Sequence, residues 1–230
     1  MENPNTPGYW DQTHHDDAGR LRIGEERLSL IEALLPDDVQ VLDIGCGTGE
    51  LGRWLAYKRP LKQDYTGVDF SDIAMLSAES ARARQEFITT NAETLAGVPD
   101  DAYHVVVCME TLEHLSDDAL ALVNMRRVCK DGGLIVVTVP HGGRNRSPEH
   151  VREYGIMDCI RLAEPVGELV RLEPVGDGCN WESLLVVIQV TKEEQRVEAE
   201  QAEEQAETEQ AGEESAEAEV RAKDGGQVVG

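Results

Sequence analysis

The stretch Val41-Leu42-Asp43-Ile44-Gly45-Cys46-Gly47-Thr48-Gly49 decides the fold, because it runs from a short apolar strand through a glycine loop into a helix. Glycines at this junction let the backbone turn tightly and approach a ligand closely, with the helix amino terminus pointing at it. The spacing is GxGxG and not the dinucleotide GxGxxG, and Asp43 stands two residues before the first glycine. An acid there favours a ligand with a positive amino or sulfonium group and opposes a pyrophosphate. A glycine turn that binds nothing is the plainer alternative.

A second motif, Gly67-Val68-Asp69-Phe70-Ser71, stands at the end of the next apolar segment. An acid at a strand tip can accept hydrogen bonds from both hydroxyls of a ribose, as in other nucleoside-binding sheets. Phe70 would then offer a flat apolar face to a base. Taken alone, Asp69 is an ordinary strand-end residue or helix cap. Together with the glycine loop, it indicates nucleoside binding.

Strand and helix signals alternate through residues 1–190, which is the pattern of an α/β doubly wound sheet. The run Val105–Met109 is apolar throughout, as expected of a strand covered on both faces. Helices are predicted at 21–35, 51–60, 71–85, 117–130 and 153–162, with Ser71 as the cap of the third. Strands are predicted at 39–44, 65–70, 87–90, 105–109, 134–139, 168–173 and 184–190.

The segments DIGCGTG, GVDFS, TTNAETL, VVVCMETLEHL and KDGGLIVVTVP occur in an order that resembles the class I S-adenosylmethionine-dependent methyltransferases across residues 9–190. The resemblance implies a Rossmann-like seven-stranded sheet of order 3-2-1-4-5-7-6, its last strand antiparallel, with helices on both faces. It also implies that S-adenosylmethionine lies over the carboxyl ends of strands 1, 2 and 4. The residues that it assigns to the cofactor are Asp43, Gly45, Cys46, Gly47, Gly49, Asp69, Phe70, Asn91, Ala92, Cys108 and Met109.

The roles implied by the resemblance follow the cofactor from one end to the other. The glycine loop would surround the methionine part, Asp69 the ribose and Phe70 the adenine. Asn91 stands where the family usually has an acid, and its side-chain carbonyl can still accept from the adenine amino group. Cys108 and Met109 would line the cofactor with backbone groups. Tyr9 and Trp10 resemble the amino-terminal cap that covers the cofactor in this family.

A second cluster, Glu110-Thr111-Leu112-Glu113-His114, follows the fourth predicted strand. In a helix this spacing puts Glu110, Glu113 and His114 on one face. Two carboxylates and an imidazole beside the methyl group could hold a divalent cation such as Mg²⁺, or His114 and Glu113 could supply a catalytic base. Acids in a first helical turn are also favourable against the helix dipole without any metal.

The same cluster sharpens the resemblance. The pattern C-M-E-x-L-E-H looks like the ubiquinone-biosynthesis O-methyltransferases, and E-x-x-E-H with a distant histidine looks like the small-RNA 3′-terminal 2′-O-methyltransferases. In those families the cluster binds a metal that orients neighbouring hydroxyls. The resemblance therefore implies four metal ligands, which are Glu110, Glu113, His114 and His150.

The charge of the chain restricts its partners. There are 45 acidic and 21 basic residues, and the formal charge is −24. Nonspecific binding to duplex nucleic acid or to anionic membrane needs a positive field, so this charge argues against both. The sequence shows neither a membrane span nor a signal peptide, and we expect a cytoplasmic protein. Five cysteines without a CxxC pair indicate reduced thiols.

The carboxyl-terminal segment differs in composition from the rest. From Thr191 onward there is no Leu, Ile, Met, Cys or aromatic residue. Such a segment cannot bury enough apolar surface to offset its ordering entropy. We therefore expect a methyltransferase domain over residues 1–191 and a disordered acidic tail over residues 192–230.

These patterns predict an enzyme that transfers the methyl group of S-adenosylmethionine to an oxygen of a small-molecule acceptor, with nitrogen and carbon as alternative targets. Two other functions stay open. One is terminal 2′-O-methylation of RNA, which the negative charge disfavours. The other is binding of S-adenosylmethionine without catalysis, with the acidic tail as a partner-binding segment. No sequence pattern predicts an oligomeric state.

Overall fold

The computed structural model describes residues 6–16, 23–59, 63–78, 85–142, 147, 149–176 and 182–192. The chain divides into two compact units, Met1–Thr191 and Lys192–Gly230. Every helix and strand below belongs to the first unit. The predicted acidic tail lies outside the described residues from position 193 onward. None of the helices within the described ranges is long and apolar enough to cross a membrane.

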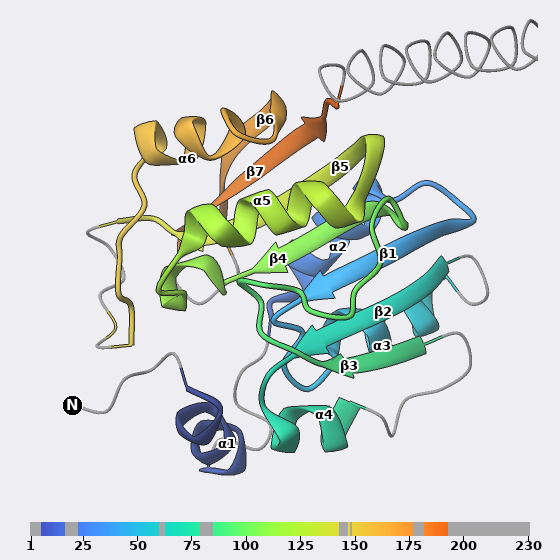
Figure 1. Ribbon diagram of the computed structural model, residues 1–230, viewed down its shortest axis with the longest axis vertical. Helices are drawn as coiled ribbons and strands as arrows, with labels where there is room; N and C mark the ends of the chain where they lie inside the picture. The colour runs from blue at the N-terminus through green and yellow to red at the C-terminus, as the bar shows by residue number, and fades with distance from the viewer. Residues whose placement is uncertain are drawn as a thin grey trace, which may run out of the picture. The chain divides into compact units, whose positions relative to one another are not determined.

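Seven strands form one sheet in the order β3-β2-β1-β4-β5-β7-β6 (Figure 1). Strands β1 to β5 run parallel to one another, whereas β7 is antiparallel to both β5 and β6. The predicted strand order and antiparallel last strand are confirmed. The strands are β1 (Val39–Ile44), β2 (Gln63–Asp69), β3 (Gln85–Thr89), β4 (Tyr103–Met109), β5 (Cys129–Pro140), β6 (Gly167–Gly176) and β7 (Glu182–Val190).

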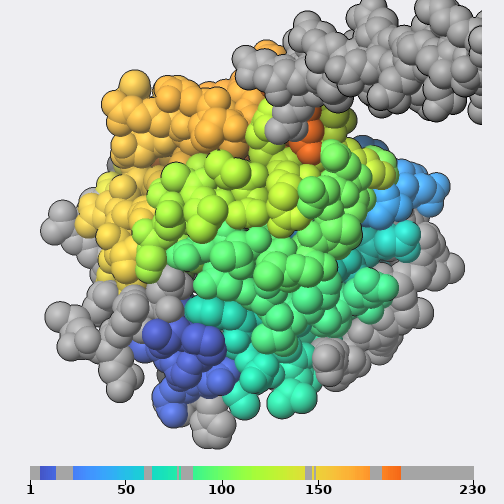
Figure 2. Space-filling model, in the orientation of Figure 1, coloured from blue at the N-terminus to red at the C-terminus, as the bar shows by residue number. Residues whose placement is uncertain are grey.

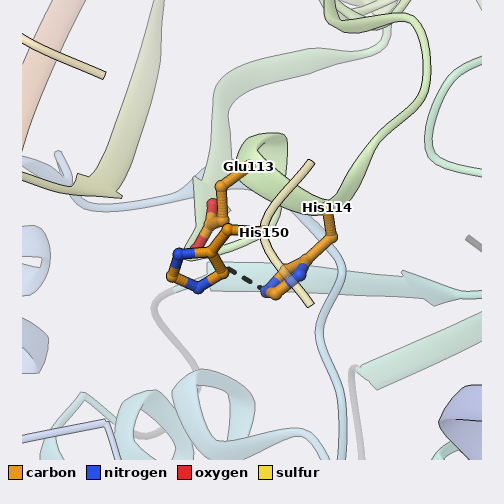
Figure 3. Close-up of side chains that lie close together, drawn as sticks. All are labelled: Glu113, His114 and His150. Atoms are coloured by element: carbon orange, nitrogen blue, oxygen red, sulfur yellow. Dashed lines mark ion pairs between the residues drawn. The ribbon is translucent and has the colours of Figure 1, made fainter. Parts of the chain in front are cut away.

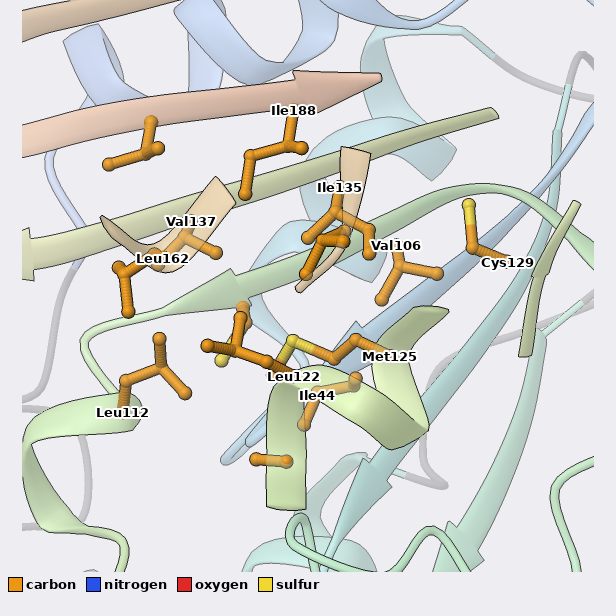
Figure 4. Close-up of a cluster of buried hydrophobic side chains, with 14 of the residues drawn as sticks. Ile44, Val106, Leu112, Leu122, Met125, Cys129, Ile135, Val137, Leu162 and Ile188 are labelled. Atoms are coloured by element: carbon orange, nitrogen blue, oxygen red, sulfur yellow. The ribbon is translucent and has the colours of Figure 1, made fainter. Parts of the chain in front are cut away.

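Helices cover both faces of the sheet (Figure 1), because successive residues of a buried strand point to opposite sides. Leu42 and Ile44 of β1 join the apolar cluster under α5 and α6, part of which Figure 4 shows. Val41 joins the second cluster, under α2 and α3. The helices are α1 (Pro7–Asp16), α2 (Glu25–Leu34), α3 (Glu50–Lys58), α4 (Asp72–Ala78), α5 (Asp118–Val128) and α6 (Ile156–Ala163).

Parallel pairing brings the carboxyl ends of the central strands to one edge of the sheet. Ile44, the last residue of β1, lies beside Val68 of β2 and Cys108 of β4. The segments that leave these three strands therefore start next to one another. They contain the glycine loop, Asp69 and the Glu110–His114 cluster.

The predicted boundaries differ most from the structure at two places. Helix α5 ends at Val128, and β5 begins at Cys129, where the sequence predicted helix through Lys130. Gly132 takes a φ of +71°, which a glycine adopts at little cost, so the predicted breaker lies inside the strand. Helix α4 ends at Ala78, and Gln85 already belongs to β3.

Candidate active site

The glycine loop leaves β1 and turns toward β2. Gly45, Gly47 and Gly49 have φ angles of 70°, 50° and 78°, in the left-handed region that favours glycine. The Gly45 amide donates to the Val68 carbonyl oxygen at 2.8 Å. A Cβ on Gly45 would lie 2.3 Å from Thr111 Oγ1. The loop thus contacts both β2 and the segment that follows β4.

Asp69, at the end of β2, is held by two backbone amides. Its Oδ2 accepts from Gly47 at 3.0 Å and its Oδ1 from Ser71 at 2.9 Å. The carboxylate therefore connects the glycine loop to the start of α4. Because each carboxylate oxygen has two lone pairs, it can still accept from a ribose hydroxyl. Phe70, the next residue, is half-buried.

Asp43 has a partner that the motif does not reveal. Its carboxyl group is 1% exposed, and its Oδ2 accepts from the Tyr65 hydroxyl at 2.7 Å. Burial raises the pKa of Asp43 to about 7, against the opposing effect of the Tyr65 hydrogen bond. Gly52 of α3 makes room for this tyrosine, because a Cβ there would lie 2.8 Å from its ring. Asp43 is thus a buried acid whose pKa lies far above that of an ordinary aspartate.

The other residues assigned to the cofactor lie at the same edge of the sheet. Asn91 and Ala92 are half-buried. Asn91 Oδ1 already accepts from the Glu93 amide at 2.6 Å, so a ligand would share this carbonyl with the backbone. Three of the assigned residues are buried, and these are Cys46, Cys108 and Met109.

Glu113, His114 and His150 come together past the end of β4 (Figure 3). Each offers one ligand atom, and these atoms lie within 4.8 Å of one another. Glu113 Oε1 is 3.7 Å from His114 Nε2, and the two imidazole centroids are 5.0 Å apart. The 3₁₀ turn η1 (Leu112–His114) supplies the first two residues, and the segment between β5 and α6 supplies the third.

Burial controls the protonation of this cluster. It lowers the pKa of His114 to about 4, so the ring is neutral at pH 7. His114 Nδ1 lies 3.1 Å from the Glu149 carbonyl oxygen, which can only accept, so Nδ1 carries the proton and Nε2 keeps its lone pair. Burial, reinforced by Glu110, raises the pKa of Glu113. Glu113 Oε2 is buried and has no hydrogen-bond partner among the residues that the structure describes. An imidazole lone pair beside an unsatisfied carboxyl oxygen fits a divalent cation.

Glu110 is not in a helix with Glu113 and His114, so the shared helical face that this spacing would give in a helix does not form. Its amide still donates to the Thr138 carbonyl oxygen of β5, at 2.9 Å, which extends the sheet ladder past β4. Its φ is +46°, and only the short 3₁₀ turn follows. Its carboxylate pairs with Arg27 of α2, with Nη1 and Oε1 3.2 Å apart. The compact group therefore contains three of the four predicted ligands.

Arg27 was missed in the sequence. It is 4% exposed, and its Nη2 donates to Ser183 Oγ of β7 at 3.2 Å. The sequence offered one signal for Arg27, which is its place directly before Leu28 in an amphipathic helix. A charge that is buried at such a position requires a partner. Arg27 links α2 to the end of β4 and places a positive charge beside the two glutamates.

Helix α1 was also missed. Its sequence has few apolar residues, and it packs against α4, as the blue and teal surfaces in Figure 2 show. Asp11 Oδ1 accepts from Ser71 Oγ at 2.7 Å and from the Ile73 amide at 3.2 Å. Ser71 in turn caps α4 by accepting from the Ala74 amide at 3.1 Å, as predicted.

The same helix reaches the cluster. The Trp10 ring lies edge-on to the His114 ring, with centroids 4.8 Å apart. The Tyr9 side chain hydrogen-bonds the Glu149 side chain, next to His150. Tyr9 and Trp10 were the only sequence signal for a covering segment. α1 therefore contacts both the start of α4 and the Glu113–His114–His150 group.

Known proteins resemble this chain in sequence. Residues 42–137 match the family described as "Methyltransferase domain". The ubiquinone biosynthesis O-methyltransferase of Leptothrix cholodnii is 33% identical over 135 residues, which are 56% of this chain and 54% of that protein. The enzyme of that name from Marinobacter nauticus is 30% identical over 153 residues, or 61% and 59% of the two chains. The chain thus spans about half the length of the curated relatives it matches.

Solved structures share the fold at low identity. A [4+2]-cyclase, SpnF, superimposes with a TM-score of 0.68 at 18% identity, over 82% of this chain and 96% of that one. The 1,6-didemethyltoxoflavin-N1-methyltransferase of Burkholderia thailandensis, solved with S-adenosylhomocysteine, gives 0.66 at 18% identity, over 81% and 87%. Together, these comparisons show that residues 42–137 are similar in sequence to the methyltransferase domain family and that the chain shares its fold, including the strand order, with these solved structures.

Proposed function

We propose that the chain transfers the methyl group of S-adenosylmethionine to a hydroxyl oxygen of a small molecule, assisted by a divalent cation at Glu113, His114 and His150. The observation that carries the proposal is the position of this group. Thr111, which packs against Gly45 of the glycine loop, is only two residues from Glu113. A cation site therefore adjoins the loop where the family's cofactor binds.

The cofactor side of the proposal rests on the edge formed by β1, β2 and β4. The glycine loop and Asp69 are already fixed to one another by a hydrogen bond, so the ribose acceptor is in place before a ligand arrives. Pre-positioned groups lose little conformational entropy on binding. A fold neighbour solved with S-adenosylhomocysteine supports the choice of cofactor.

On the acceptor side, the residues must hold a hydroxyl in line with the methyl group. A bound cation would lower the pKa of the acceptor hydroxyl and fix its direction. His114 keeps its Nε2 lone pair available because Nδ1 faces the Glu149 carbonyl oxygen. Trp10 covers one edge of the His114 ring and helps to exclude water. Positioning of this kind accounts for much of the rate in methyl transfer.

A cation-free mechanism, with His114 as general base, is the second candidate. Burial holds the pKa of His114 at about 4. A base is most effective when its pKa is near the working pH, so this imidazole is a weak base at pH 7. Its neutral state suits a ligand, and this favours the cation.

The choice of oxygen as the target rests on the curated relatives, which are named O-methyltransferases. Fold alone does not decide the reaction, because one structural neighbour is a cyclase. A test is turnover of S-adenosylmethionine with a panel of neutral hydroxyl acceptors, followed by release of S-adenosylhomocysteine. We expect release that stops with EDTA and returns with Mg²⁺ or Mn²⁺. If the chain binds the cofactor but forms no S-adenosylhomocysteine with any acceptor of the panel, it would instead be a binding module.

A further inference from the structure

The segment that carries His150 lies between β5 and α6, outside any helix or strand. It is joined to the turn after β4 by backbone contacts on both sides of the imidazole. The Val151 amide donates to the Glu113 carbonyl oxygen at 2.9 Å. The Glu149 carbonyl oxygen lies 3.1 Å from His114 Nδ1. The cluster is thus assembled from two loops that contact each other directly.

A set of three side chains, here named the Asp118 clamp, fastens the same segment to α5. It consists of Asp118, Arg152 and Tyr154. One oxygen of the Asp118 carboxylate pairs with Arg152 Nη1, and the other accepts from the Tyr154 hydroxyl at 2.7 Å. Arg152 Nη2 also donates to the Ser116 carbonyl oxygen at 2.9 Å. A single carboxylate therefore holds two residues that follow His150.

The clamp is partly withdrawn from water. The Tyr154 residue is 3% exposed, and the Asp118 and Arg152 side chains are 28% and 24% exposed. The Tyr154 carbonyl oxygen accepts from Gly142 at 2.7 Å, which ties the segment to the end of β5 as well. Charge-assisted bonds in such a site are stronger and more directional than ion pairs in open solvent.

We propose that Asp118 is the positioning residue that sets His150 against Glu113 and His114, a role that rests on the cation site proposed above. Asp118 is placed to act through Arg152 and Tyr154 rather than through the cation. Residues 147 and 149–155, the part of this segment around His150 that the structure describes, belong to none of the named helices and strands, so these bonds restrict where the imidazole lies. Groups that orient metal ligands typically change metal affinity 10- to 100-fold when they are removed.

The test measures the binding of Mn²⁺ to the full chain. The electron paramagnetic resonance signal of the free ion reports how much Mn²⁺ stays unbound. The informative variant is Asp118→Asn, which keeps the shape and removes the charge. The matched control is Asp100→Asn, because Asp100 pairs with Arg127 at the other end of the same helix. A site variant, Glu113→Gln, reports the cation site itself. Affinity for S-adenosylhomocysteine is measured on each protein by calorimetry.

We expect Asp118→Asn to raise the Mn²⁺ dissociation constant about tenfold or more, with cofactor affinity unchanged. Asp100→Asn should bind Mn²⁺ like the wild type. Arg152→Gln should lose Mn²⁺ affinity. Arg152→Lys should keep most of the Mn²⁺ affinity, because of these two variants only the lysine preserves the positive charge opposite Asp118.

Two results would overturn the inference, and they differ in what else they overturn. If Glu113→Gln loses Mn²⁺ but Asp118→Asn and Arg152→Gln bind it like the wild type, the cation site stands and the clamp has no part in it. If the wild type binds no Mn²⁺, or Glu113→Gln binds it equally well, the cation site and the clamp's role both fail.

Discussion

Asp69 connects the glycine loop, through Gly47, to the amide of Ser71. We predict that Asp69→Ala weakens binding of S-adenosylmethionine by about 1.5 to 3 kcal/mol, because a ribose diol would lose a charged acceptor. Calorimetry with S-adenosylhomocysteine measures this loss. Asp72→Ala, an exposed acid in the first turn of α4, is the control and should bind normally. Normal affinity in Asp69→Ala would remove Asp69 from the cofactor site.

Asp43 makes stability depend on pH in an unusual direction. Burial raises its pKa from 3.8 to about 7 in the folded chain. Between these values the folded chain keeps a proton that the unfolded chain has lost, so the free energy of unfolding falls as the pH rises from about 4 to about 7. Above about pH 7 Asp43 no longer makes the free energy of unfolding depend on pH. The effect amounts to at most about 4 kcal/mol.

We therefore predict that Asp43→Asn flattens the pH dependence of the free energy of unfolding over this range. Urea unfolding of the wild type and the variant at pH 5, 6, 7 and 8, without cofactor, measures it. The wild type should lose stability relative to Asp43→Asn with each step up to pH 7. A constant difference between the two proteins across all four pH values would show that Asp43 is ionised in the folded chain throughout.

Among the elements, α1 is the one whose attachment depends most on single side chains. Asp11 accepts from both Ser71 and the Ile73 amide of α4. We predict that Asp11→Ala raises the amide hydrogen exchange of residues 7–16 and leaves the exchange of β1 and β4 unchanged, because residues 7–13, the part of α1 whose burial is described, add no residue to the buried core. Gln12→Ala, on an exposed position of the same helix, is the control. Unchanged exchange in Asp11→Ala would mean that the aromatic contacts alone hold the helix.

The strands could be predicted from the sequence because their apolar runs and breakers are local signals. Val105–Met109 is apolar throughout and lies in both core clusters, as a strand covered on two faces must. The position of the Glu110 carboxylate could not be predicted, because its partner Arg27 is distant in sequence. The Tyr65 partner of Asp43 was hidden for the same reason, since it comes from a neighbouring strand. The residue types of the site can be predicted from the sequence, whereas the partner of each side chain depends on tertiary contacts.

At the scale of the whole molecule, the two units differ in what they contribute. Thr191 ends the first unit, and its carbonyl oxygen accepts from Arg126 of α5 at 2.8 Å. We predict that deleting residues 193–230 leaves the melting temperature and the cofactor affinity nearly unchanged, because the deleted segment offers no large apolar side chain to a core. Differential scanning calorimetry of the two chains checks this. A drop of several degrees would show that the segment packs against the domain.

In the proposed reaction, Glu113, His114 and His150 act on the acceptor and not on the cofactor. The most direct test compares Glu113→Gln with the wild type in two quantities, the single-turnover rate of methyl transfer to an acceptor found by screening and the affinity for S-adenosylmethionine. We predict a rate at least about 100-fold lower with cofactor affinity within about twofold, because the hydrogen bonds given for Asp69 and Gly45 do not involve Glu113. A Glu113→Gln rate equal to that of the wild type would contradict it.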